Sequence, residues 1–274
     1  MESLSTLLAT VLYLFSAVAF CISECRRVKA LHPTALLFAG GGLLSHTAAL
    51  WFRCYETPVP ALFNTRFALS FFGFLLVTLF LSVYLRHKRP ILGAFVMPLA
   101  TISVAGSLFI PSGPVSVNPA LKNSLVIVHL MFLFVAYAFF ALAFCISIMY
   151  VLQERMIKKK NIQGWITRMP SLETLDRINH SCILIGFPFM TVGLIIGFAA
   201  AKILWHRGWS GDPKEVFSIL TWIIYAVLFH ERLAVGWRGK KASWLAICGF
   251  ASVVVTFLGV NLFMKGHHTT FTGR

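Results

Sequence analysis

Three of the nine histidines in this sequence, His46, His129 and His230, lie within long apolar stretches. An ionisable side chain in such a stretch is costly unless it has a partner, so each is a candidate functional residue. A further pair, His267 and His268, follows the last apolar stretch. Neutral imidazole binds zinc, copper and iron alike, so these residues predict a metal or metal-cofactor site without choosing the metal. Histidines that only hydrogen-bond within the protein core remain the alternative for His46 and His129.

The composition around these histidines favours a large flat ligand over a bare ion. The chain has 26 Phe and 7 Trp, and Trp205 and Trp209 flank a short polar segment. No HExxH, CxxC or CxxCH motif occurs, which argues against a zinc protease, a structural zinc site, a redox dithiol and haem attached covalently to this chain. Bis-His ligation of a haem iron takes one imidazole from each side of the ring, which His129 and a tail histidine can supply.

The polar segment itself reads WHRGWSGDPKE from Trp205 to Glu215. Its last four residues predict a helix start, with Asp212 as N-cap, Pro213 in the first helical position and Glu215 in the third. Capping explains the DPKE sequence but not the two tryptophans. We therefore expect the aromatic residues, rather than the charged ones, to have a role beyond local structure.

The elements that must position these residues are membrane-spanning helices. Of the residues, 58% are hydrophobic and 12% charged, which predicts an all-α integral membrane protein. Apolar runs of about 20 residues are long enough to span a bilayer. They predict about eight transmembrane helices, near residues 4–23, 33–52, 67–85, 91–110, 123–151, 181–201, 217–234 and 243–264. The cytoplasmic stretch 157–177 is predicted as one or two short interfacial helices broken at Pro170, with a solvated linker as the alternative.

The charge pattern predicts the orientation of these helices. The net charge is +15, but the basic residues lie in short clusters between apolar runs, which argues against a nucleic-acid-binding face. The connections after the first, third, fifth and seventh helices hold most of the 24 Lys and Arg residues, so they are expected in the cytoplasm. Both termini, the Trp-flanked loop and the tail histidines are then extracytoplasmic.

The stretch WSGDPKEVFSILTWIIYAVLFHERL, residues 209–233, resembles the Trp-rich WWD region of the CcsA/CcmC-type cytochrome c assembly proteins, a haem-handling family that includes HemX-like members. Residues 118–144 and 257–271 are similar to the family segments that carry two external haem ligands. The positions that match the WWD region are Trp205, Trp209, Ser210, Asp212, Pro213, Lys214, Glu215, Leu220, Trp222, Tyr225 and His230.

The resemblance implies a single polytopic membrane domain over 1–274, in which 1–117 forms four N-terminal helices and 118–274 forms the assembly-like region with its Trp-rich loop at 203–216. It also implies a non-covalent haem b on the outer face, between that loop and the axial ligands His129 and His268. His230 would bind or relay haem within the membrane, with His46 as a possible partner. The remaining haem-binding positions that it implies are Trp205, Trp209, Asp212 and Trp222.

The implied function is haem handling in cytochrome c biogenesis, in the bacterial cytoplasmic membrane. The expected partners are haem, an apocytochrome c, a second assembly subunit and the lipid bilayer. The chain would be at most one part of a haem-attachment enzyme. It departs from the family pattern at Gly211 and Phe217, which stand where the family has Trp.

Two other functions are weighed against this one. A HemX-like regulator of tetrapyrrole synthesis is favoured by Gly211, by the short chain and by the basic stretch at 158–160. A transporter without a haem role would use the membrane histidines for proton relay. The absence of an intramembrane carboxylate to pair with them, and of Gly/Pro-broken helices in corresponding halves, argues against a transporter.

Overall fold

The computed structural model describes residues 1–56, 65–110, 123–160, 167–205, 211 and 213–259, and every structural statement below refers to these residues. Within them the chain is all-helical, and eight helices are long and apolar enough to cross a membrane. The prediction of an eight-helix integral membrane protein is thereby confirmed. The helices are α1 (Glu2–Arg26), α2 (Leu31–Glu56), α3 (Thr65–His87), α4 (Ile91–Leu108), α5 (Ser124–Lys158), α6 (Leu172–Trp205), α7 (Pro213–His230) and α8 (Lys240–Val254).

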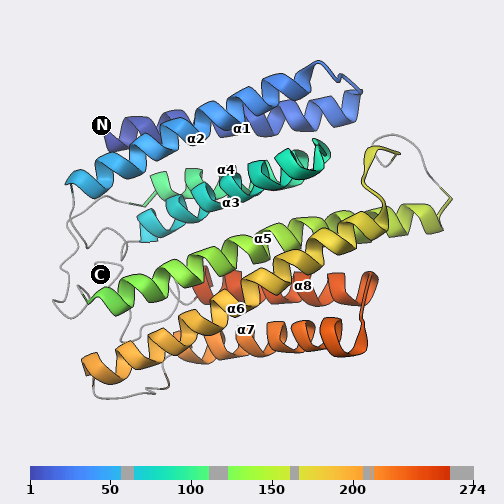
Figure 1. Ribbon diagram of the computed structural model, residues 1–274. Helices are drawn as coiled ribbons and strands as arrows, with labels where there is room; N and C mark the ends of the chain where they lie inside the picture. Colours follow the sequence, from blue (N-terminus) through green and yellow to red (C-terminus); the bar gives the residue numbers. More distant parts are fainter. Residues whose placement is uncertain (57–64, 111–122, 161–166, 206–210, 212, 260–274) are drawn as a thin grey trace.

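The helices run up and down in one bundle, with α1 to α4 on one side and α6 to α8 on the other (Figure 1). In the first group α1 packs against α2 and α4, and α3 packs against α4. In the second group α5 packs against α6 and α8, and α7 packs against α6 and α8. The long helix α5 also contacts α3 and α4, so it is the element that joins the two groups.

Two short π-helical segments, η4 (Glu231–Val235) and η5 (Val255–Gly259), continue α7 and α8. Segments of this kind are rare and often occur near functional sites. η4 begins directly after His230 and is followed by Gly236, whose φ of 77° is left-handed. The turn into α8 is thus placed immediately after one of the candidate histidines.

Side-chain hydrogen bonds occur at the starts of α5 and α7. α5 is capped by Asn123, whose side chain accepts a hydrogen bond from the Leu125 amide at 2.9 Å. α7 begins at Pro213, as the sequence predicts, and the Glu215 carboxylate accepts a hydrogen bond from the Gly211 amide at 3.1 Å. The predicted N-cap, Asp212, lies outside the described residues.

The prediction of interfacial helices over 157–177 is wrong at both ends of that stretch. α5 continues to Lys158, and α6 begins at Leu172 rather than near 181. The physical reason is that polar residues in the first turns of α6 find partners inside the bundle. Asp176 pairs with Arg232, and Leu175 is fully buried.

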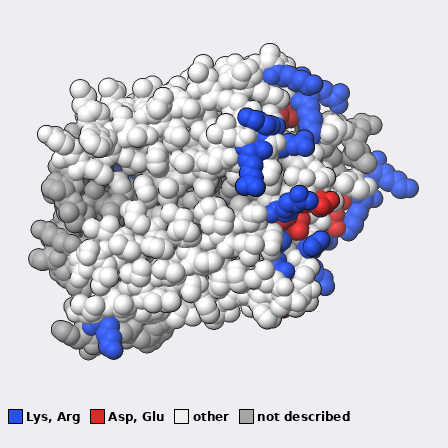
Figure 2. Space-filling view, in the orientation of Figure 1, with Lys and Arg blue, Asp and Glu red and all other residues white. Residues whose placement is uncertain are grey.

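Basic side chains gather at one end of the molecule (Figure 2). Comparison with Figure 1 shows that this is the end where α1 is connected to α2, α3 to α4, and α7 to α8. The positive-inside rule predicts such a concentration of Lys and Arg at the cytoplasmic end. The orientation in the membrane stays a prediction. The end of the bundle opposite the basic end is called the outer end.

Candidate functional site

His129 lies near the start of α5, at the outer end of the bundle, and its imidazole faces α6. Its Nδ1 atom is 2.7 Å from the backbone carbonyl oxygen of Gly193. A carbonyl oxygen can only accept a hydrogen bond, so Nδ1 carries a proton, and in the neutral imidazole Nε2 then holds the lone pair. This tautomer is the one that presents Nε2 as a metal ligand, and a backbone carbonyl is a common partner for the other nitrogen of a ligating histidine.

Two glycines of α6 lie against α5, and one of them, Gly197, makes room for this imidazole. A Cβ atom added at Gly197 would lie 2.5 Å from Cε1 of His129, closer than packed atoms tolerate. At Gly193 an added Cβ would meet the side chain of Leu133 at 3.0 Å. The spacing of the two glycines is that of a GxxxG motif, which lets membrane helices approach closely. The glycines therefore set both the approach of α5 to α6 and the position of the His129 ring.

Trp222 connects α7 to α6, the helix that His129 faces. Its indole Nε1 donates a hydrogen bond to Oγ1 of Thr191 at 3.0 Å. Its ring lies 5.8 Å from that of Phe187, with an interplanar angle of 33°. Trp222 therefore joins α7 to α6, and its partner Thr191 lies two residues before Gly193 in α6.

The Trp-flanked loop begins where α6 ends, at Trp205. From Gly197 to Trp205 is eight residues, so the end of α6 lies about 12 Å beyond the level of His129 along the helix axis. Three predicted site residues, Trp209, Asp212 and His268, lie outside the described residues. The structure thus brings His129, Trp222 and the end of α6 to the outer part of the α5–α6–α7 group.

Gly211 has a φ of 70°, in the left-handed region. Glycine adopts this conformation without strain, whereas a residue with a Cβ atom rarely does. A tryptophan at this position, as in the family pattern, would need a different local backbone. The glycine at this position is therefore consistent with its left-handed backbone.

His46 is placed in the other helix group and is fully buried. Its Nε2 atom is 2.8 Å from Oγ of Ser70, and its Nδ1 atom is 3.3 Å from the hydroxyl of Tyr13. The ring also meets Phe74 edge-on, with 5.6 Å between centroids. Both nitrogens thus have partners within the protein, and the arrangement is that of a polar tie between α1, α2 and α3.

His230 ends α7 with an exposed side chain. It lies at the basic end of the bundle, away from His129, and α7 is on the opposite side of the bundle from α2, which carries His46 (Figure 1). The structure therefore brings neither His46 nor His129 to His230.

A buried polar network next to His230 was missed by the sequence reasoning. Arg232, whose side chain is 2% exposed, contacts Asp176 at 3.2 Å and Oδ1 of Asn179 at 2.7 Å. Asn179 in turn donates to the Ala143 carbonyl and to Ser147. The network links η4 to α5 and α6. Its signal in the sequence was an Asp and an Asn three residues apart, on one face of a helix that was predicted to start too late.

Comparison with known proteins decides the family. A profile described as "Cytochrome C assembly protein" matches residues 62–268, which is most of the chain. This chain belongs to the cytochrome c assembly protein family. The expected membership of a cytochrome c assembly family is thereby confirmed.

Similar members of the family are proteins named cytochrome c biogenesis protein CcsA. The one from Guillardia theta is 31% identical over 212 residues, covering 70% of this chain and 70% of the relative. Those from Heterosigma akashiwo and Gloeobacter violaceus are 28% and 27% identical, each over 96% of this chain and more than nine-tenths of the relative. The likeness therefore extends over the N-terminal helices as well as the WWD-like region.

A solved structure also shares the fold of this family member. It is named cytochrome c heme lyase CcmF, and it aligns over 100% of this chain with a TM-score of 0.59 and 16% sequence identity. The chain spans 48% of the length of that protein. At this identity the likeness supports the helix arrangement alone.

Proposed function

We propose that this family member holds haem at the outer end of α5, α6 and α7 and presents it to an apocytochrome c. The observation that carries the proposal is the His129 hydrogen bond to the Gly193 carbonyl, at 2.7 Å. That bond orients the ring and leaves Nε2 as the nitrogen with a lone pair. The residues present therefore fit one axial ligand of a haem iron.

The other roles follow the family resemblance. His268 would be the second axial ligand, and Trp205, Trp209 and Asp212 would form the outer contact of the ring. Trp222 would act through α6, because its bond to Thr191 holds α7 beside the helix that orients His129. Bound non-covalent haem b would supply an iron whose potential and oxygen reactivity are set by its axial imidazoles.

His230 would take haem at the basic end of the bundle, where its exposed side chain ends α7. The network of Arg232, Asp176 and Asn179 fixes the segment that follows it. His46 is less suited to this role, because both of its ring nitrogens already have partners. We therefore propose that His46 holds the N-terminal helices together.

The partners implied by this function are an apocytochrome c and a second assembly subunit, in the bacterial cytoplasmic membrane. The experiment that tests the haem assignment is an absorption spectrum of the purified chain. A bis-histidine haem spectrum is expected, and it should be lost in a His129→Ala, His268→Ala double variant. Replacing His87, which ends α3 at the basic end, gives the control.

A second function is favoured by one observation, the left-handed backbone of Gly211. The Trp-rich surface of this loop differs from the family pattern where the glycine stands, which suits a HemX-like regulator of tetrapyrrole synthesis that does not present haem to a cytochrome. This function predicts that deletion changes the level of the first enzyme of the tetrapyrrole pathway while c-type cytochromes stay normal. Loss of those cytochromes would exclude it.

A further inference from the structure

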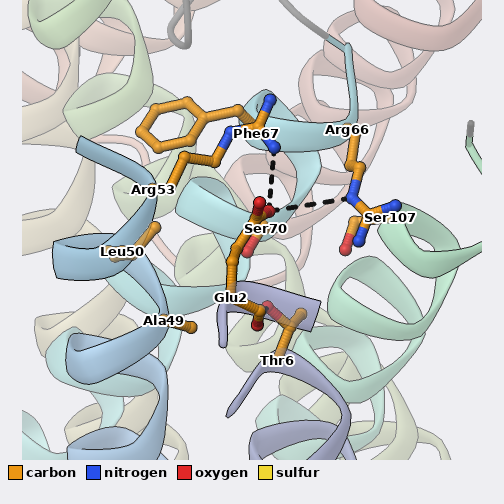
Figure 3. A pocket seen from close by; sticks show the side chains of 9 residues that line it. All are labelled: Glu2, Thr6, Ala49, Leu50, Arg53, Arg66, Phe67, Ser70 and Ser107. Carbon is orange, nitrogen blue, oxygen red and sulfur yellow. Dashed lines mark hydrogen bonds and ion pairs between the residues drawn. The ribbon is translucent and has the colours of Figure 1, made fainter. Parts of the chain in front are cut away.

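The two ends of α3 differ in how their arginines are paired. At the outer end, Arg66 lies beside the Glu2 carboxylate, which also pairs with Arg53 of α2 (Figure 3). At the basic end, Arg86 lies in the last turn of α3 and Arg89 in the connection to α4, and both are exposed. Neither of these two guanidinium groups forms an ion pair or a hydrogen bond with the described residues. Residues 84–90, which include both arginines, are called the α3–α4 corner.

The sequence supplies no carboxylate within this corner. α3, α4 and the connection between them contain neither Asp nor Glu. On α1, α5 and α6, the carboxylates at the basic end already contact cations; they are Glu24, Glu154, Glu173 and Asp176. Of these, Glu173 is exposed and its partner is Arg177. The α3–α4 corner therefore carries a local excess of positive charge.

Two further cations add to this excess. Lys88, in the same corner, is exposed. The charged groups close enough to act on the His87 imidazole are Arg86, Arg89 and Arg177, so α6 brings Arg177 to the same corner. Like charges held close together repel one another, and a bound anion would offset that repulsion. A guanidinium has five N–H donors in a fork that matches the oxygens of a phosphate, so a phosphate group fits the two arginines well.

The surroundings of the corner indicate what the phosphate is attached to. α3 is long and apolar enough to span a membrane, and only Lys88, Arg89 and Pro90 separate it from α4. So short a connection keeps the charges at the level of the lipid head groups. Leu85, directly before Arg86, is 65% exposed, and the Tyr84 ring lies 5.9 Å from Nζ of Lys88. Tyr, Lys and Arg at a helix end are typical of the membrane interface, and the exposed leucine offers apolar surface beside them.

We propose that the α3–α4 corner binds the phosphate of an anionic phospholipid, with Arg86 and Arg89 as its main partners. Lys88 and Arg177 strengthen the attraction, and the acyl chains lie along the exposed side of α3 at Leu85. Basic groups at the ends of membrane helices are known to bind anionic head groups in this way. An acidic segment of another protein would match the charges alone, because it has no acyl chain to cover the leucine. The proposal does not rest on haem binding by this chain.

The test is native mass spectrometry of the full chain, released from detergent micelles and titrated with phosphatidylglycerol or with phosphatidylcholine of the same acyl chains. The first phosphatidylglycerol should bind about tenfold more tightly than phosphatidylcholine, the scale of one charge-assisted hydrogen bond. An Arg86→Gln, Arg89→Gln double variant should lose this preference. The matched control is a Lys240→Gln, Lys241→Gln double variant, which removes two adjacent charges at the start of α8, at the same end of the bundle, and should keep the preference.

A conservative variant separates lost binding from a folding defect. Arg86→Lys with Arg89→Lys keeps both charges, so it should prefer phosphatidylglycerol more strongly than the glutamine variant does while melting in detergent like the wild type. Equal binding of the two lipids by the wild type overturns the proposal. Equal losses in the two glutamine double variants also overturn it, because they would show a general effect of positive charge. A wild type without lipid preference that binds a soluble hexaglutamate peptide through Arg86 and Arg89 would indicate an acidic protein partner and contradict the proposal.

Discussion

At the scale of single residues, the proposed haem site depends on how one imidazole is held. His129 is oriented by the Gly193 carbonyl and packed against Gly197. Neither contact is made by a side chain, so the orienting partner is the backbone of α6 itself. Substitutions in α6 that keep His129 intact can therefore disturb the site.

Gly197→Ala tests this orientation. The added Cβ would lie 2.5 Å from Cε1 of His129, so the ring must move and its bond to Gly193 should break. We expect haem affinity to fall by about 10–100-fold, the usual effect of losing a partner of a ligating residue. Haem titration of the purified variant measures it.

Gly40→Ala is the control for that substitution, because an added Cβ at Gly40 meets nothing within 4 Å. A Gly197→Ala variant that binds haem as tightly as the Gly40→Ala variant would contradict the role given to the α6 backbone.

At the scale of helices, most boundaries could be predicted from apolar runs, because lipid contact imposes continuous hydrophobicity. The start of α6 could not, because its first turns carry polar residues that are paired inside the bundle. Asp176 and Asn179 look solvated in the sequence, and only their contact with Arg232 shows otherwise. Likewise, the burial of His46 could be predicted, but the different partners of His46 and of the half-buried His129 could not.

Asp176→Ala tests the importance of that network for the α6–α7 assembly. Arg232 would remain buried without its carboxylate, which typically costs about 3–5 kcal/mol. The midpoint of unfolding in detergent should fall clearly. Glu173→Ala, one turn earlier on α6, removes an exposed ion pair with Arg177 and should change stability by about 1 kcal/mol or less. Equal effects of the two substitutions would argue against a structural network.

At the scale of the whole molecule, the bundle has a basic end and an outer end (Figure 2). The family match places the chain among the cytochrome c assembly proteins. The positive-inside pattern predicts which end of the bundle faces the cytoplasm. The proposed function requires this orientation, because an apocytochrome c is expected to meet the outer end.

Cysteine labelling in intact cells checks the orientation. A single Cys at Lys88, in the α3–α4 connection, should be protected from a membrane-impermeant maleimide, and a single Cys at Gly211 should react. The remaining cysteines are replaced first, and permeabilised cells show that both positions are accessible. Reaction at Lys88→Cys with protection at Gly211→Cys would reverse the orientation.

Haem binding through His129 and His268 is tested by the absorption spectrum of the purified chain with and without these two residues. Axial ligation by His129 and His268 predicts a six-coordinate, bis-histidine haem spectrum in the wild type. It also predicts loss of that spectrum in the His129→Ala, His268→Ala double variant and partial recovery when imidazole is added. A wild-type protein that binds no haem, or a double variant with an unchanged spectrum, would contradict it.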